Sequence, residues 1–391
     1  MNKIYLISYL FAPVGRAPGI NRTYLAKYLA EEGWDIDVIS CANPHGLFRS
    51  FPLDKALLDI LPPSVHLHPI KSFYWGAIGG MGALLKLWED PFHNWYRPVM
   101  ENSQSLLSKK GILYAVVPPV INARIAFDLS RRTKMPFLMD FRDNVYDLPA
   151  AKVKASASII ASSVKCLQDM REHYDLPDIT GRVIYNGYPV ECHPDKAVNE
   201  KSDSLKIIYT GLMGMAQSPV LVARAVRLLE RIHPETRDRI NLEYYGPANY
   251  YTKFFLRRYL GRNIHYRGYL PFMDTLRIIA GADLLSVTLQ PGKRDYSYAI
   301  PSKIFQALAT ATPVLAAGTT GGALQDFVVS NGIGRFSAAD DIENQAEDIY
   351  SFWKNPHKRR EMVENIKKIK VEYHTRYQAR LLSEHLRMLF N

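Results

Sequence analysis

The feature that most constrains this chain is an alternation of short, continuously apolar segments with helical segments, which occurs twice along its length. In the first half, Lys3–Leu10, Ile112–Val117 and Pro136–Phe141 are such apolar segments, and helical patterns separate them. Strands that are apolar on both faces are typical of parallel sheets covered by helices on both sides. The first half therefore predicts one α/β domain with a doubly wound parallel sheet.

The second half repeats the same scheme. Leu205–Thr210, Asp283–Leu289 and Pro313–Ala316 read as buried strands, and a helix is expected near Ser302–Thr310. In doubly wound sheets, ligands bind outside the carboxyl ends of the strands. We therefore expect two tandem doubly wound domains whose ligand sites face a shared interdomain cleft.

The boundary between the domains is expected in residues 186–204, which are polar, rich in turn residues and without periodicity. This places a first domain over residues 1–186 and a second over residues 187–370. Residues 371–391 read as an amphipathic helix that packs back on the first domain. With 391 residues, the chain is too long for one compact core and fits two α/β domains.

Composition excludes several classes of protein. The three cysteines include no CxxC pair, which argues against a disulfide framework and a zinc site, and the histidines have no ligand spacing. The net charge of +11 is spread over both halves, and no nucleic-acid-binding motif accompanies it. A general positive field suits phosphorylated substrates or an anionic membrane surface. We expect no metal, no cofactor and no nucleic-acid partner.

The first residues superficially resemble a signal peptide, but their apolar stretch is short and lacks a convincing cleavage site. They read better as a buried first strand. No run approaches the roughly 20 apolar residues that span a bilayer. The sequence therefore predicts a cytoplasmic protein, with peripheral contact at the inner face of the plasma membrane left open.

The sharpest local feature is the segment Tyr298–Gln306, followed by a small-residue stretch. Pro301 suits the first turn of a helix, whose start favours an anion. Ser302 would add a hydroxyl donor and Lys303 a positive charge, so the segment predicts a diphosphate seat without a metal. A capped surface helix is the alternative reading.

This segment resembles the signature region of the GT-B glycosyltransferases, specifically the retaining family four (group 1), in a branch with a Pro-Ser-Lys pattern. The resemblance covers nearly the whole chain, through the order and spacing of several motifs. These are Phe11–Gly15, Pro18–Arg22, Leu25–Gly33, Val117–Pro119, Asp140–Asp143, Val183–Gly187, Ile208–Gly214, Tyr245–Gly246 and Gly268–Leu270. The fold it implies is GT-B, with two tandem Rossmann-like domains.

The resemblance also implies a set of site residues. The nucleotide-sugar-binding positions are Gly15, Gly19, Arg22, Gly211, Gly214, Gly268, Tyr269, Pro301, Ser302, Lys303 and Gln306, and the catalytic positions are Arg142, Asp143 and Tyr298. Within this set, Gln306 would hold the ribose hydroxyls and Tyr298 would touch the donor sugar. Arg142 falls where many members have a histidine near the sugar, although it could simply be ion-paired.

The sequence departs from the family pattern at four positions. Both signature glutamates are replaced, by Tyr298 and Gln306, and the family's Arg and Lys after the first strand of the second domain appear as Leu212 and Gln217. Other cations would then carry the phosphate charge: Lys303, Arg22, Lys293 and Arg294 are the candidates.

The glycine-broken aromatic segment within residues 72–88 has two open readings. It could pack between sheet and helix, or it could form an interfacial or acceptor-side loop anchored by Trp75 and Trp88. The second reading would give the first domain a peripheral membrane contact.

The function implied is transfer of a hexosyl or N-acetylhexosaminyl group from a nucleotide-diphosphate donor, with a UDP-sugar favoured. The acceptor would be a glycan or lipid-linked molecule in surface polysaccharide assembly, and the mechanism would be retaining. The alternative is a non-catalytic paralogue that binds nucleotide or glycan as the partner of another transferase. A sugar-nucleotide epimerase of the same fold is a weaker third reading.

Overall fold

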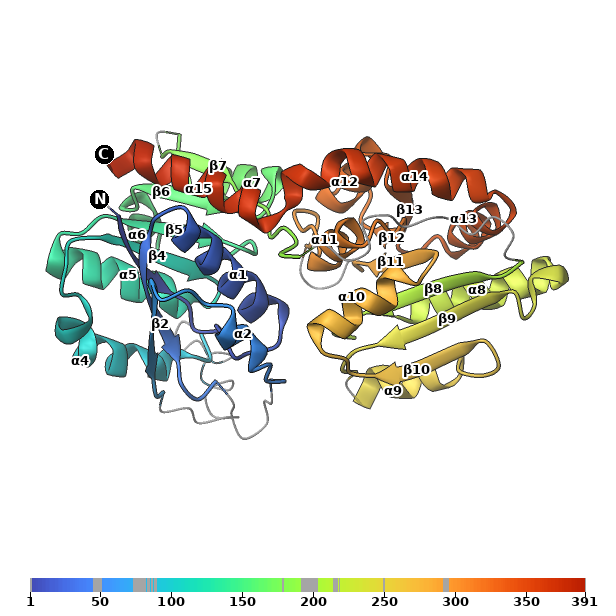
Figure 1. Ribbon diagram of the computed structural model, residues 1–391, viewed down its shortest axis with the longest axis horizontal. Coiled ribbons are helices and arrows are strands. Elements are labelled where there is room, and N and C mark those ends of the chain that lie inside the picture. The colour runs from blue at the N-terminus through green and yellow to red at the C-terminus, as the bar shows by residue number, and fades with distance from the viewer. Residues whose placement is uncertain are drawn as a thin grey trace. The chain divides into compact units, whose positions relative to one another are not determined.

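The structure is a computed structural model of the chain. It describes residues 2–44, 51–72, 82, 85, 87, 90–177, 179–190, 203–213, 217, 219–248, 250–290 and 295–390. The chain forms two compact units: unit 1 comprises Met1–Asn186 and Thr375–Asn391, and unit 2 comprises Gly187–His374 (Figure 1).

Unit 1 is built on a seven-stranded parallel sheet in the order β3-β2-β1-β4-β5-β6-β7. The strands are β1 (Lys3–Ile7), β2 (Asp35–Cys41), β3 (Val65–Ile70), β4 (Ile112–Val117), β5 (Phe137–Phe141), β6 (Ser158–Ala161) and β7 (Gly181–Val183). Every residue of the central strands β1 and β4 is buried, as continuous apolar runs predict for a sheet covered on both faces.

The helices that cover this sheet follow its strands along the chain. They are α1 (Ala17–Glu31), α2 (Ala56–Asp59), η1 (His93–Trp95), α4 (Tyr96–Leu106), α5 (Val120–Thr133), α6 (Ala150–Lys154) and α7 (Val164–Tyr174). Local sequence sets several of their ends. Helix α7, for example, begins where the Ser163 hydroxyl accepts a hydrogen bond from the Cys166 amide.

The last helix, α15 (Thr375–Phe390), returns to unit 1. The indole of Trp34 donates a hydrogen bond of 2.8 Å to the Ser383 hydroxyl, and the Ser158 hydroxyl lies 2.8 Å from His385 Nε2. All four side chains are buried. Their pairing therefore satisfies polar groups whose isolated burial would be costly.

Unit 2 has a six-stranded parallel sheet in the order β10-β9-β8-β11-β12-β13. The strands are β8 (Leu205–Thr210), β9 (Ile240–Tyr245), β10 (Ile264–Gly268), β11 (Leu284–Thr288), β12 (Val314–Gly318) and β13 (Gly334–Ala338). The helices are α8 (Val220–Ile232), η2 (Pro234–Thr236), α9 (Tyr250–Arg257), α10 (Phe272–Ala280), α11 (Ser302–Ala309), α12 (Ala323–Ser330), α13 (Ile342–Lys354), α14 (Pro356–Ile369) and η3 (Lys370–Tyr373).

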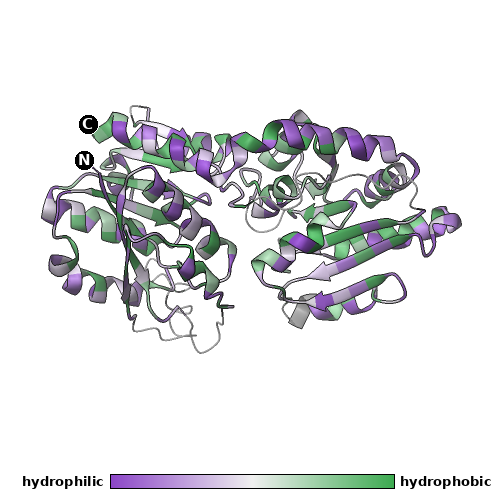
Figure 2. Cartoon of the chain, viewed as in Figure 1, coloured by the Kyte–Doolittle hydropathy of each residue, from purple (hydrophilic) through white to green (hydrophobic). Residues whose placement is uncertain are grey.

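Both sheets confirm the predicted class of fold, two doubly wound parallel sheets. The strand order reverses between β1 and β4 in unit 1 and between β8 and β11 in unit 2. Ligands of open α/β sheets bind at such switch points, outside the carboxyl ends of the strands. Figure 2 shows that the outer helix α14 is largely hydrophilic, whereas the buried strands are mainly hydrophobic. No helix in the described part of the chain is long and apolar enough to cross a membrane.

Candidate functional site

Three glycines line the carboxyl edge of the sheet in unit 2. Gly211, Gly246 and Gly268 lie at the ends of β8, β9 and β10, and all three have positive φ angles, of 92°, 135° and 86°. The Gly211 amide donates to Tyr245 O at 2.8 Å, and the Gly246 amide donates to Gly268 O at 2.7 Å. A Cβ atom on Gly246 would lie 2.1 Å from Gly211 O, so only glycine fits there.

Lys303 extends from the first turn of α11 over this glycine edge. A Cβ atom on Gly211 would lie 3.0 Å from Lys303 Cε and 3.8 Å from Lys303 Nζ, which places the ammonium at the end of β8. Lys303 Nζ also lies 4.1 Å from the centre of the Tyr209 ring. The side chain is therefore held at the switch point of unit 2 by packing and by a cation–π contact.

The Lys303 ammonium is buried and makes no hydrogen bond to any described residue. Lys303 is only 7% exposed, and its Nζ atom has no hydrogen-bond partner among the residues that the structure describes. Burial alone lowers the pKa of Lys303 to about 7, because desolvation disfavours the charged form. A lysine in this state has a large unmet preference for an anion, which makes it a candidate for ligand binding.

Gln306 lies one turn further along α11 and faces the same strand end. Its Oε1 accepts a hydrogen bond of 3.2 Å from the hydroxyl of Thr210, the last residue of β8. Pro301 is the N-cap residue of α11, and Ser302 is its first residue. The structure thus brings three of the predicted residues, Gly211, Lys303 and Gln306, together at the end of β8.

The remaining predicted residues of unit 2 are less closely tied to this seat. Tyr298 is buried, 4% exposed, in the turn before α11, and Tyr269 is 43% exposed just after β10. Their predicted roles stay predictions. Gly214, Lys293 and Arg294 lie outside the described residues.

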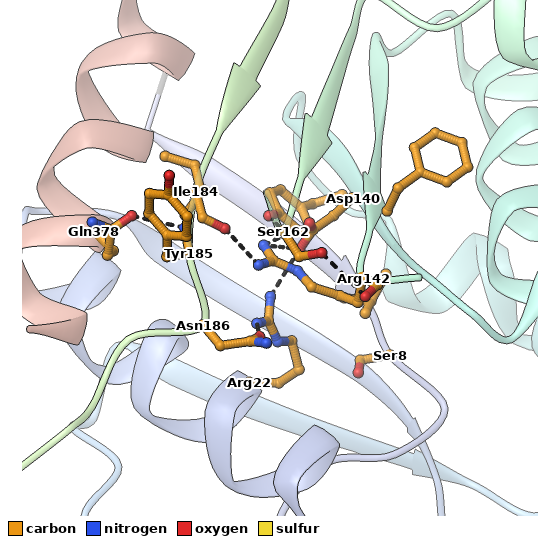
Figure 3. Close-up of polar contacts among 12 residues, drawn as sticks. Ser8, Arg22, Asp140, Arg142, Ser162, Ile184, Tyr185, Asn186 and Gln378 are labelled. Carbon is orange, nitrogen blue, oxygen red and sulfur yellow. Dashed lines mark hydrogen bonds and ion pairs between the residues drawn. The ribbon is translucent and has the colours of Figure 1, made fainter. Parts of the chain in front are cut away.

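In unit 1, the predicted residues Arg22 and Arg142 converge on one buried carboxylate, that of Asp140 (Figure 3). Arg22 Nη1 donates to Asp140 Oδ2 at 2.8 Å, and Arg142 Nη2 donates to the same oxygen at 2.7 Å. The Tyr114 hydroxyl donates a third bond to it, also at 2.7 Å. We call these four residues the Asp140 cluster.

The Asp140 cluster also holds the chain where it leaves unit 1. Arg142 Nη1 donates to Ile184 O at 2.7 Å, and Arg22 Nη2 donates to Asn186 Oδ1 at 3.2 Å. Between these residues, the Tyr185 amide donates to Gln378 Oε1 of α15 at 2.8 Å. Three consecutive residues are thereby fixed to α1, to the end of β5 and to α15, as Figure 3 shows.

Burial governs the electrostatics of the Asp140 cluster. Desolvation, followed by repulsion from Arg142, lowers the pKa of Arg22 to about 10, although Asp140 acts in the opposite direction. Desolvation also raises the pKa of Tyr114 above its usual range, so this hydroxyl stays a donor. Both guanidinium groups are already engaged by Asp140, which agrees with the ion-paired reading of Arg142. A direct contact of either arginine with substrate stays a prediction.

The other predicted residues of unit 1 are two glycines, Gly15 and Gly19, and Asp143. A Cβ atom on Gly19 would lie 2.2 Å from Val14 O, and one on Gly15 would lie 3.2 Å from Asp54 Cβ. Packing of the first loop against its surroundings therefore explains both glycines. Asp143 is exposed beside Arg142.

Within the described residues, no group of three or more His, Cys, Asp or Glu side chains could hold a metal ion.

The sequence analysis did not assign four residues to the site: Asp140 as the centre of its cluster, Tyr114, Asn186 and Tyr209. Only Asp140 gave a signal, because it stands near the carboxyl end of a buried strand. The rest depend on tertiary packing.

Comparisons with known protein families and solved structures indicate which proteins this chain resembles. The family described as "Glycosyl transferase-like" matches residues 224–384. No protein in the curated set matches the sequence significantly. Among solved structures, sucrose-phosphate synthase from Thermosynechococcus elongatus is similar over 100% of this chain and 99% of its own, with a TM-score of 0.71 and 15% identity.

Two further solved structures share the fold. One, described as trehalose-6-phosphate from E. coli bound with UDP-2-fluoro glucose, matches with a TM-score of 0.70 and 10% identity over 98% of both chains. The other is WaaG, a glycosyltransferase involved in lipopolysaccharide biosynthesis, with a TM-score of 0.63 and 14% identity over 98% of this chain and 99% of that one. At these identities, the likeness shows the GT-B fold. The glycosyl transferase-like match over residues 224–384 agrees with this fold.

Proposed function

We propose that this chain is a glycosyltransferase that uses a nucleotide-diphosphate sugar, with a UDP-sugar favoured, and transfers the sugar with retention to a glycan or lipid-linked acceptor in surface polysaccharide assembly. The observation that carries the donor class is the buried ammonium of Lys303 at the glycine edge of unit 2, which no described residue pairs. A diphosphate supplies the anion that this group lacks. Similar folds that are described as UDP-2-fluoro glucose-bound and as a lipopolysaccharide galactosyltransferase support the proposal.

Transfer of the sugar leaves negative charge on the departing diphosphate. A preorganised cation in a site that excludes water stabilises that charge strongly, since little reorganisation is needed when the bond breaks. Lys303 would act in this way, together with the amino-terminal end of the α11 dipole. Gln306 would hydrogen-bond a ribose hydroxyl. In the proposed retaining mechanism a donor phosphate oxygen takes the acceptor proton, so no protein base is required.

The direct test is a panel of UDP-, GDP- and dTDP-sugars assayed for binding and for sugar release or transfer. We expect one nucleotide class to bind and to be turned over slowly even without acceptor. Tight binding without any turnover, also with polysaccharide precursors added, would instead favour the non-catalytic paralogue. Free sugar and nucleotide released together at the full rate without acceptor would favour the epimerase.

Nucleotide affinity should fall as the pH rises above about 7. Free Lys303 has a pKa of about 7 and is already protonated below it, so affinity should be nearly constant there. Above this pH, binding must also protonate Lys303, and affinity should fall by up to tenfold per pH unit. The terminal phosphate of a nucleoside diphosphate is ionised in this range, because its last pKa is about 6. Calorimetry in buffers of different ionisation enthalpy should detect the proton uptake.

Arginine at this position provides the matched control for the pH effect. The guanidinium group of the Lys303→Arg variant would stay protonated across the range, so the nucleotide affinity of this variant should not depend on pH above 7. Equal affinity of the parent protein at about pH 7 and about pH 9 would contradict a role of Lys303 as the phosphate-binding cation.

A further inference from the structure

A surface in unit 2 combines exposed apolar side chains with unneutralised positive charge. It is formed by residues 253–262, which include the last turn of α9 and the loop after it, and we call it the α9 patch. Phe254 is 62% exposed, more than any other aromatic side chain in the described part of the chain, and Leu260 is 37% exposed. Helix α9 lies beside β10, an edge strand of the sheet (Figure 1).

Packing fixes the direction in which the α9 patch faces. Leu256 is 1% exposed and belongs to the hydrophobic core of unit 2. Because neighbouring residues on a helix point in different directions, burial of Leu256 turns Phe254 outward. Arg258, in the turn just after the helix, is also exposed. The Phe255 ring supports both of them: it meets the Phe254 ring edge-on at 5.5 Å, and the Arg258 guanidinium lies 5.4 Å from its centre.

The charge of the α9 patch has one sign. Residues 253–262 contain four cations, Lys253, Arg257, Arg258 and Arg262, and no Asp or Glu. Arg262 pairs with Asp238 at 3.1 Å. No carboxylate in the described residues pairs with the other three cations. Lys253 Nζ lies instead against the Tyr266 ring, 5.7 Å from its centre.

We propose that the α9 patch docks unit 2 onto an anionic lipid surface. Single exposed apolar residues are common on soluble proteins, so Phe254 alone would not indicate a binding surface. Phe254 and Leu260, however, lie in a ten-residue segment that also carries four cations and no carboxylate. Exposed apolar and cationic side chains together suit the boundary between acyl chains and phosphate headgroups. The aromatic ring enters the boundary while the long cationic side chains reach the phosphates. This role does not depend on nucleotide binding or on transfer.

Vesicle flotation with the full-length protein tests the proposal. We expect the protein to bind vesicles of phosphatidylcholine mixed with phosphatidylglycerol, to bind pure phosphatidylcholine weakly, and to be released by high salt. The triple variant Phe254→Ser, Arg257→Gln and Arg258→Gln should bind the anionic vesicles at least about 30-fold more weakly. The tryptophan emission of Phe254→Trp should shift to the blue when anionic vesicles are added, beyond any shift of the parent.

A matched control removes one exposed apolar side chain and two cations elsewhere in unit 2. This control is the triple variant Val371→Ser, Lys367→Gln and Lys368→Gln. Val371 is 61% exposed, and both lysines lie on α14. Its vesicle binding should fall by no more than about threefold. Equal losses in both variants, or binding by the parent that ignores lipid charge, would overturn the proposal. Melting curves and nucleotide affinity should be unchanged in both, which separates this test from that of the transferase function.

Discussion

Replacing Lys303 with methionine should abolish nucleotide binding and at the same time increase the free energy of unfolding. Methionine has a similar length and no charge, so it can fill the same space beside Gly211 and over the Tyr209 ring. The variant loses the cation that we expect to meet the diphosphate. It also removes a buried ammonium that has no hydrogen-bond partner among the described residues, and such a group is costly in the folded state.

The expected gain in stability depends on pH in a defined direction. The pKa of Lys303 is 10.5 when unperturbed and about 7 in the folded protein, so between these values the unfolded chain binds more protons. The stability of the parent therefore rises with pH across this window, and the penalty is greatest below about pH 7. We expect a gain of about 1–3 kcal/mol from Lys303→Met at about pH 6 and a smaller gain at about pH 9. Urea unfolding at the two pH values measures this.

Lys354→Met is the control for Lys303→Met. Lys354 is exposed on α13, 4.3 Å from the centre of the Trp353 ring, and is far in sequence from the glycine edge. Its replacement should change stability by less than about 0.5 kcal/mol and leave nucleotide binding intact. If Lys303→Met were instead destabilised while binding nucleotide as the parent does, Lys303 would be a structural residue and the proposed seat would be wrong.

The interior of the fold could be predicted from the sequence because buried strands leave a strong signal. Runs such as Ile112–Val117 are apolar at every position, and β4 occupies the same residues. Two of the edge strands leave a weaker signal, since polar residues interrupt them. Strand β3 reads Val-His-Leu-His-Pro-Ile and β13 reads Gly-Arg-Phe-Ser-Ala, and the sequence analysis predicted neither. Both lie at a sheet edge.

The candidate site could be predicted only where a backbone rule applied. The helical pattern after Pro301 located the start of α11, although Pro301 is the N-cap residue and not, as predicted, part of the first turn. The sequence could not show how the Lys303 ammonium is buried, since that depends on the distant residues Tyr209 and Gly211. Nor could it show that Arg22 and Arg142, well separated in the chain, share one carboxylate. Side-chain pairing of this kind is a property of the packed structure.

The largest loss of stability is expected from Asp140→Asn. Asparagine preserves the shape of the side chain, but it removes the only charge that the described contacts set against Arg22 and Arg142. Both guanidinium groups are buried, with side-chain exposures of 3% and 11%, so each would remain charged in an apolar environment. Breaking a buried ion pair in this way typically costs about 3–5 kcal/mol. Chemical denaturation followed by circular dichroism should show this loss.

Two further variants distinguish loss of charge balance from simple loss of packing. Adding Arg22→Met to Asp140→Asn removes one uncompensated cation, so the double variant should be more stable than the sum of the single effects predicts, by about 1–3 kcal/mol. Glu101→Gln removes an exposed pair with Arg97, whose side chain is 84% exposed, and should leave the stability nearly unchanged. Strict additivity of Asp140→Asn and Arg22→Met would show that the carboxylate does not hold the arginines electrostatically. The Asp140 cluster would then hold the segment Ile184–Asn186 through hydrogen bonds and packing, and not through charge balance.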